Sequence, residues 1–276
     1  MDQSLPPGLY IVATPIGNLS DLSPRAAETL RRAELILAED KRVTAKLLAH
    51  TGARAPMITY HDHSSDEDRR RALDAIATKA VALVSDAGTP LISDPGYKLV
   101  RAARHAGLPI FTIPGPCAAV AALTVAGLPT DRFLFAGFLS AKSKARRDSI
   151  SEFAAIRASL VFYESGPRLG DSLGDLATVL GDRQAAVVRE ISKLHEECVT
   201  GTLGELAARY AGAPPKGEIV IVVGPPAEQD ATEDDLDSAL QEALATLSPS
   251  RAAAEVATRL NIPKKRAYAR ALELSR

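Results

Sequence analysis

The residues best suited to chemistry in this chain lie in polar, constrained turns that follow short apolar runs. SDAGTPLISDPG (residues 85–96) follows the apolar run 80–84 and holds two aspartates, two glycines and two prolines. The turns ATPIGN (13–18), EDKR (39–42) and PGPCA (114–118) also follow apolar runs. When parallel strands end together, such turns meet at the carboxyl edge of the sheet, where ligands bind.

Carboxylates in these turns are candidates for acid–base work. Glu39 and Asp40 end an apolar run, so they either transfer protons or cap the following helix, and capping is favoured for Asp40. The two aspartates of 85–96, taken alone, predict helix capping. Further along, Glu164, Glu190 and Lys193 place charge inside β-like runs, which indicates either a site or a salt-bridge network.

Basic residues gather in two places that suit a polyanion. Lys142, Lys144, Arg146 and Arg147 follow a β-like run and predict either a phosphate-contacting patch or a solvated helix start. Residues 251–276, which include Lys264, Lys265 and Arg266, carry an excess of five positive charges. A basic module of helix-turn-helix size predicts either a nucleic-acid arm or a helical hairpin with a solvated face.

The composition excludes several classes of protein. The net charge of −1 over 276 residues means that any polyanion must be held by local patches. Two cysteines, Cys117 and Cys198, predict neither a disulfide framework nor a metal cluster. The chain shows no signal-peptide pattern and no apolar run of the roughly 20 residues that would span a bilayer. We therefore expect a cytoplasmic protein without a metal and without a membrane partner.

The elements that must position these residues alternate regularly at first. Apolar runs predict strands at 9–13, 35–38, 57–60, 80–85 and 109–113, with helices near 23–33, 41–50, 66–78, 97–106 and 116–126. This alternation is typical of a mostly parallel sheet with helices on both faces.

The rest of the chain changes character. Five strands within 132–224 and helices near 143–156, 167–180 and 203–211 predict a second, mixed sheet that contains a hairpin. We therefore expect an α/β chain with an N-terminal domain (1–128), a second α/β domain (129–226), an acidic linker and helix (227–246) and a small basic helical module (247–276).

Taken together, the turns resemble one known family. LYIVATPIGNLSDLSPRA, EDKR, SDAGTPLISDPGY, IPGPCA, GLPTDRFLFAGFL, VFYESGPRL, REISKLHEE and KGEIVIVVG occur here in the order found in the ribosomal RNA small subunit methyltransferase I family. That family belongs to the tetrapyrrole methylase superfamily. The resemblance implies a two-domain tetrapyrrole-methylase-like fold and covers roughly residues 8–225.

The resemblance also implies an activity. Such enzymes transfer a methyl group from S-adenosylmethionine to the ribose 2′-oxygen of a cytidine in the decoding centre of 16S ribosomal RNA. They act on the assembled small ribosomal subunit and are expected to be homodimers. The general base is then sought among Glu39, Asp40, Glu164, Glu190 and Lys193. The basic residues named above become RNA contacts.

The cofactor residues follow from the matching motifs. Asp94 stays assigned to helix capping, whereas Asp86 is expected to face the cofactor. The full set implied by the resemblance is Ile16, Asp86, Ala87, Gly88, Thr89, Pro114, Gly115, Pro116, Cys117, Ala118, Tyr163 and Ile191. One departure concerns EDKR, since the family usually has Thr where Lys41 stands; a lysine there can instead meet a phosphate.

Two other functions compete with this one. A tetrapyrrole small-molecule methylase shares the superfamily's fold, although the basic terminal module argues against it. A non-catalytic ribosome-assembly factor would bind RNA through residues 142–147 and 251–276 without turning over a cofactor.

Overall fold

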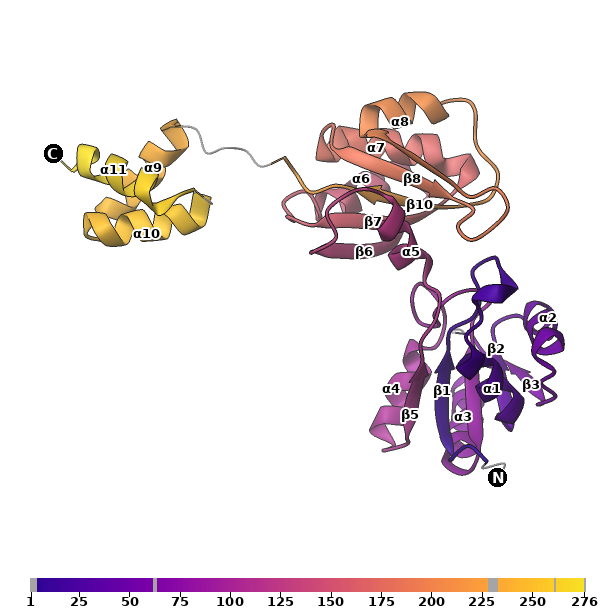
Figure 1. Cartoon of the computed structure of the whole chain (residues 1–276). Coiled ribbons are helices and arrows are strands. Elements are labelled where there is room, and N and C mark those ends of the chain that lie inside the picture. Colours follow the sequence, from indigo (N-terminus) through magenta and orange to yellow (C-terminus); the bar gives the residue numbers. More distant parts are fainter. Residues whose placement is uncertain (1–3, 62–63, 228–232, 261, 276) are drawn as a thin grey trace. The chain divides into compact units, whose positions relative to one another are not determined.

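The computed structural model describes residues 4–61, 64–227, 233–260 and 262–275. The chain forms two compact units, Met1–Pro226 and Ala227–Arg276 (Figure 1). In the described part of the chain, no helix is both long and apolar enough to span a membrane.

The paired strands of the first sheet in the larger unit are all parallel, where the sequence predicts a mostly parallel sheet. Its strands lie in the order β3-β2-β4-β1-β5. They are β1 (Gly8–Val12), β2 (Leu35–Ala38), β3 (Met57–Thr59), β4 (Ala80–Val84) and β5 (Ile110–Ile113). β2 and β4 are buried along their whole length, which explains their uninterrupted apolar sequences.

Helices cover both faces of this sheet (Figure 1). α1 (Pro24–Arg32) and α2 (Lys41–Thr51) share one core with β1 and β2. α3 (Asp66–Thr78) and α4 (Tyr97–His105) share the core on the opposite face. The chain therefore leaves the neighbouring strands β1 and β4 toward opposite faces. This reversal opens a crevice at their carboxyl ends.

The second sheet is mixed, with strand order β6-β7-β10-β8-β9. β6 and β7 are parallel and every other pair is antiparallel, so the predicted hairpin of β8 and β9 is confirmed. The strands are β6 (Phe133–Phe138), β7 (Ser159–Ser165), β8 (Gln184–Arg189), β9 (Glu197–Thr202) and β10 (Glu218–Val223).

One face of the second sheet packs on α6 (Ser143–Ser151), α7 (Leu169–Leu180) and α8 (Leu203–Tyr210). The other face receives α5 (Ala118–Val125) through Ala119, Ala122 and Leu123. The sequence prediction ended the first domain at residue 128, whereas α5 packs on the second sheet. The small alanine side chains of this helix allow its close approach to β7 and β10. Two short 3-10 helices, Leu19–Asp21 and Gly166–Arg168, complete the unit.

The smaller unit is a three-helix module. α9 (Glu233–Leu244), α10 (Pro249–Leu260) and α11 (Lys264–Leu274) enclose one core of leucine, valine and alanine side chains. The sequence prediction separated α9 from the two helices that follow. Leu236 and Leu240 of α9 are fully buried in the shared core, so the three helices form one module.

The structure contradicts the prediction that Arg146 contacts RNA. Its side chain is only 5% exposed, and its Nε lies 2.7 Å from Oδ2 of Asp175. The neighbouring Arg147 has a side chain that is 49% exposed, and its Nε is farther from this carboxylate, 3.9 Å from Oδ1 of Asp175. Successive positions on a helix point in different directions, so one arginine is buried and the next is exposed. Arg146 is therefore a structural residue.

We expect Arg146→Ala to lower the free energy of unfolding by about 3 kcal/mol or more, because it leaves the carboxylate of Asp175 buried without its main partner. Denaturant unfolding followed by circular dichroism measures this change. Arg147→Ala is the matched control and should change the stability by less than about 0.5 kcal/mol. Equal stabilities of the two variants would contradict the structural role of Arg146.

Candidate active site

The loops after β1 and β4 are tied together by a pair of backbone hydrogen bonds. Thr14 N–H donates to the Gly88 carbonyl at 2.8 Å, and Gly88 N–H donates to the Thr14 carbonyl at 3.1 Å. Gly88 has φ +82, a conformation that L side chains rarely adopt. A Cβ there would also lie 3.4 Å from Cγ2 of Ile16. Glycine therefore allows the two loops to meet at the crevice.

The loops after β2 and β4 are joined by carboxylates. The backbone N–H of Asp40 donates to Oδ1 of Asp86 at 3.0 Å, and the backbone N–H of Asp86 donates to Oε2 of Glu39 at 3.3 Å. The loops after β4 and β5 are joined by Thr89, whose hydroxyl donates to the Pro116 carbonyl at 2.9 Å. The turns that follow four different strands thus form one connected rim.

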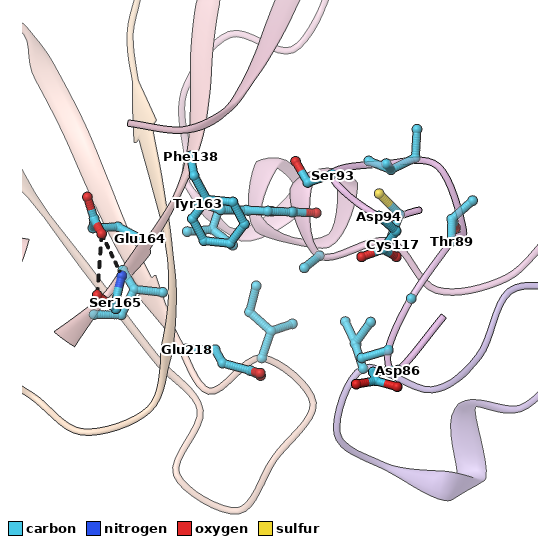
Figure 2. Close-up of a pocket in the computed structure, with 18 of the residues that line it drawn as sticks. Asp86, Thr89, Ser93, Asp94, Cys117, Phe138, Tyr163, Glu164, Ser165 and Glu218 are labelled. Atoms are coloured by element: carbon cyan, nitrogen blue, oxygen red, sulfur yellow. Dashed lines mark hydrogen bonds between the residues drawn. The ribbon is translucent and has the colours of Figure 1, made fainter. Parts of the chain in front are cut away.

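This rim and the second sheet enclose a cavity of about 360 Å³ (Figure 2). Its volume and mixed lining fall in the range of small-molecule sites. The first sheet and its loops contribute Ile16, Glu39, Asp86, Ala87, Gly88, Thr89, Ile92, Ser93 and Asp94. The remaining wall is formed by Cys117, Ala118, Phe138, Tyr163, Glu164, Ser165, Ile191, Gly217, Glu218, Ile219 and Val220.

Most of the predicted cofactor residues lie on this wall. They are Ile16, Asp86, Ala87, Gly88, Thr89, Cys117, Ala118, Tyr163 and Ile191. Within the described residues, Pro114, Gly115 and Pro116 do not line the cavity. They lie directly before Cys117, and Pro116 holds Thr89 through its carbonyl.

Tyr163 crosses from the second sheet to the start of α5. Its hydroxyl accepts a hydrogen bond from the Ala119 N–H at 3.2 Å. Burial raises the pKa of this phenol, so it stays protonated at neutral pH. The tyrosine therefore fixes α5 against β7 and forms a rigid part of the wall.

Asp94 differs from its sequence prediction. α4 begins at Tyr97 with Gly96 as its N-cap and without a side-chain cap, so Asp94 does not cap this helix. Its side chain lines the cavity near Cys117 (Figure 2). Burial raises its pKa to about 6, against the lowering effect of a hydrogen bond with Ser85, and nearby Glu39 and Asp86 raise it further. The sequence feature that could have indicated Asp94 as a site residue is its place as the second aspartate of SDAGTPLISDPG.

The structure places the predicted acid–base candidates in different surroundings. Glu39 lines the cavity, and burial raises its pKa. Asp40 caps α2, and hydrogen bonds from Arg42 lower its pKa to about 2, so the capping alternative holds. Glu164 also lines the cavity, but one oxygen accepts from the Ser172 hydroxyl at 2.6 Å and the other from Ser165 N–H at 2.8 Å.

Glu190 and Lys193 form the predicted salt-bridge network. Nζ of Lys193 lies 2.9 Å from Oε1 of Glu190 and 2.7 Å from Oε2 of Glu218. The hydrogen bond from Lys193 lowers the pKa of Glu190. In the described part of the chain, neither Glu190 nor Lys193 lines the cavity, although Ile191 between them does.

The remaining basic candidates are mostly on the surface. Lys142, Lys144 and Arg147 are exposed at the start of α6, and Lys264 and Lys265 are exposed at the start of α11. Arg266 is half-buried instead, because its guanidinium donates to Glu233 of α9 at 2.8 Å.

Sequence reasoning missed the contribution of β10 to the site. Glu218, Ile219 and Val220 line the cavity from this strand, which is otherwise an apolar core element, and Gly217 lines it from the position directly before. It also missed Ile92, Ser93, Phe138 and Ser165. All of these residues lie within motifs that carry the family resemblance, but nothing in those motifs singles them out as cavity residues. Strand pairing and loop packing between distant segments bring them to the wall.

Comparison with known families finds one matching family model in each unit. Residues 8–207 match the family model of tetrapyrrole (corrin/porphyrin) methylases, and residues 230–275 match the RsmI C-terminal HTH domain. Among solved structures, a uroporphyrin-III-C-methyltransferase from Thermus thermophilus is 21% identical, with a TM-score of 0.56. The match covers 79% of this chain and 94% of that one. A diphthine synthase is 19% identical, with a TM-score of 0.60 over 78% and 89% of the chains. These likenesses show the fold.

Curated relatives match nearly the whole chain. Proteins named ribosomal RNA small subunit methyltransferase I are 56% identical in Erythrobacter litoralis (99% of this chain, 97% of that protein) and 45% identical in Escherichia coli O157:H7 (96% and 94%). The match runs through the loops that surround the cavity and through the terminal module. The chain therefore belongs to the ribosomal RNA small subunit methyltransferase I family, within the tetrapyrrole methylases.

Proposed function

We propose that this protein uses S-adenosylmethionine to methylate the ribose 2′-oxygen of a cytidine in the decoding centre of 16S ribosomal RNA. The observation that carries the proposal is the match along nearly the full chain to proteins named as small-subunit ribosomal RNA methyltransferases. The terminal module adds support, because residues 230–275 match the RsmI C-terminal HTH domain.

The cavity fits the proposed cofactor. Its volume of about 360 Å³ suits a ligand of that size, and its wall combines apolar side chains with a few polar groups. A fold relative from Thermus thermophilus was solved as a complex with S-adenosylhomocysteine, which supports the same ligand class here. When bound, S-adenosylmethionine supplies an electrophilic methyl group on a sulfonium.

The chain's own residues then have separate tasks in this proposal. Ile16, Ala118 and Ile191 provide apolar contact, while Asp86 and Thr89 hold polar groups and brace the rim. Orientation of the attacking oxygen can account for much of the rate gain. Closing the cavity with the acceptor also excludes water, which strengthens the electrostatic interactions within it.

We propose Asp94 as the group that accepts the proton from the 2′-hydroxyl, with Glu39 as the alternative. Both line the cavity, and burial raises the pKa of each toward the working pH. Asp40, Glu190 and Lys193 are weaker candidates, because each is held in an ion pair and does not line the cavity within the described residues.

The RNA contacts in this proposal come from Lys142, Lys144 and Arg147 of the larger unit and from Lys264 and Lys265 of the terminal module. Arg266 is paired with Glu233, so its charge is largely balanced within the module. With the assembled small subunit as the substrate, the proposed location is the cytoplasm. The resemblance also implies a homodimer, which light scattering of the purified protein tests.

We expect label from radioactive S-adenosylmethionine to enter 16S RNA when wild-type protein acts on small subunits from cells that lack this modification. Nuclease digestion should then release a 2′-O-methylcytidine. Subunits that already carry the modification are the control and should accept no label. Transfer to a tetrapyrrole instead of RNA would identify a small-molecule methylase. Absence of transfer and of thermal stabilisation by the cofactor would favour the assembly factor.

We expect Asp94→Asn to lower kcat/KM for small subunits by about 100-fold or more, since the amide cannot accept the proton. For the wild type, kcat/KM should fall as the pH drops through about 6, because the carboxylate of Asp94 becomes protonated there. The variant should lose this inflection. Rates at saturating cofactor from about pH 5 to about pH 8 measure the effect.

Asp131→Asn controls for the change in charge, because Asp131 is exposed and does not line the cavity within the described residues. An unchanged profile in Asp94→Asn, together with loss of the inflection in Glu39→Gln, would assign proton transfer to Glu39.

We expect the double variant Lys264→Ala and Lys265→Ala to bind small subunits more weakly and to reduce the slope of log K against log salt by about 2. Cofactor affinity should stay unchanged, because the described cavity residues all belong to the larger unit. Lys46→Ala with Lys79→Ala removes the same charge from exposed positions elsewhere and is the matched control. A salt slope equal to that of the control would make the module structural.

A further inference from the structure

Phe138 is an exposed aromatic side chain on the wall of the cavity. It ends β6 with 61% of its surface accessible to water. Its ring stands at 66° to the ring of Tyr163, with 5.5 Å between the centroids (Figure 2). A large apolar ring held at the edge of a ligand cavity and left open on one side is suited to contact with another flat group.

The backbone of β6 turns this ring toward the cavity. The pairing of β6 with β7 shifts by one residue between Phe135 and Gly137, which is a β-bulge, and Gly137 has φ +68. Regular alternation would place Phe135 and Phe138 on opposite faces of the sheet. Because of the extra residue, both rings contact Tyr163 on the same face. The bulge thus sets the direction of Phe138.

The neighbouring Tyr163 holds Phe138 in place. Its hydroxyl accepts the Ala119 N–H, so the tyrosine ring cannot turn freely. Phe135 packs on the other part of that ring at 4.8 Å between centroids. Phe138 therefore rests on a fixed support and presents an already oriented surface.

The segment after Phe138 is also rigid and leads to positive charge. Arg168 donates to the carbonyls of Leu139 and Ser140 at 2.5 and 3.1 Å. Arg146 donates to the carbonyls of Ser140 and Ala141 at 3.4 and 3.3 Å. Lys142 and Lys144 follow directly and are exposed. A flat apolar group and two cations are thus displayed by one braced segment, residues 138–144.

We propose that Phe138 is the platform on which the base of the acceptor nucleotide stacks, with Lys142 and Lys144 meeting the phosphates beside it. This inference rests on the proposed function and deepens it. A ribose oxygen that reaches the cavity brings its base to the rim, since the base is joined to the neighbouring ribose carbon. Such a base must leave its stack in the RNA, and aromatic side chains replace the lost stacking.

The test compares Phe138→Ala with the wild type in three measurements: kcat/KM for small subunits, the Kd for small subunits with S-adenosylhomocysteine present, and the Kd for S-adenosylmethionine. We expect kcat/KM for subunits to fall about 5- to 150-fold, as for loss of one stacked base. Cofactor affinity should stay within about 2-fold of the wild type. Phe138→Tyr should restore kcat/KM because it keeps the ring.

Phe133→Ala is the matched control, since Phe133 begins the same strand, is 48% exposed and is not among the described residues of this cavity wall. Thermal unfolding of all variants checks the fold. The stacking role of Phe138 is overturned if Phe138→Ala gives the same kcat/KM for small subunits as Phe133→Ala. It is also overturned if cofactor affinity falls as much as kcat/KM, because the ring would then contact the cofactor.

Failure of the proposed function has a different signature. In that case the wild-type protein transfers no label to RNA. The Kd for small subunits alone then tests the stacking role of Phe138, because binding needs no methyl transfer. A fall in subunit affinity of about 5-fold or more for Phe138→Ala, reversed by Phe138→Tyr, supports the platform. An unchanged Kd overturns it.

Discussion

The site depends on the paired backbone hydrogen bonds between Thr14 and Gly88. They join the loops after two neighbouring parallel strands whose helices leave toward opposite faces of the sheet. Without this link, each loop would carry its own unpaired amide and carbonyl at the edge of the core, which is costly. A residue with a β-carbon at position 88 would be strained at φ +82. One glycine thus allows the two loops to form a single surface.

Around this link, the protein gathers carboxylates on the wall of the cavity. Glu39, Asp86 and Asp94 all line the cavity, and Asp86 bridges the loops through its own side chain and backbone. Grouped acids in a partly buried site raise one another's pKa, as Asp94 shows. Such a site favours a cationic ligand group and keeps a proton acceptor near neutrality. In the described part of the chain, no group of three or more His, Cys, Asp or Glu side chains is arranged to hold a metal ion.

Loops of the first sheet form the rim of the cavity, whereas the second sheet contributes a segment that hydrogen bonds hold in place. Arg146 and Arg168 have the same charge as the exposed lysines beside them, yet they brace the carbonyls of residues 139–141 from within. The ion pair of Arg146 with Asp175 anchors that support in α7. Residues of like charge therefore divide into those that shape the 138–144 segment and those that remain available to a partner.

The sequence by itself determined the strands and helices, a mostly parallel first sheet and a mixed second sheet, and its resemblance to a known family pointed to part of the cavity wall. Apolar runs, helical periodicity and constrained turns are local signals, and the ends of parallel strands meet at one edge. Only the tertiary structure decided that Arg146 is buried while Arg147 is exposed, and that Asp94 lines the cavity instead of capping α4. It also decided that the bulge in β6 turns Phe138 toward the cavity and that β10 contributes to the wall. These outcomes depend on the phase of a helix, the register of paired strands and contacts between distant segments, which no single stretch of the chain encodes.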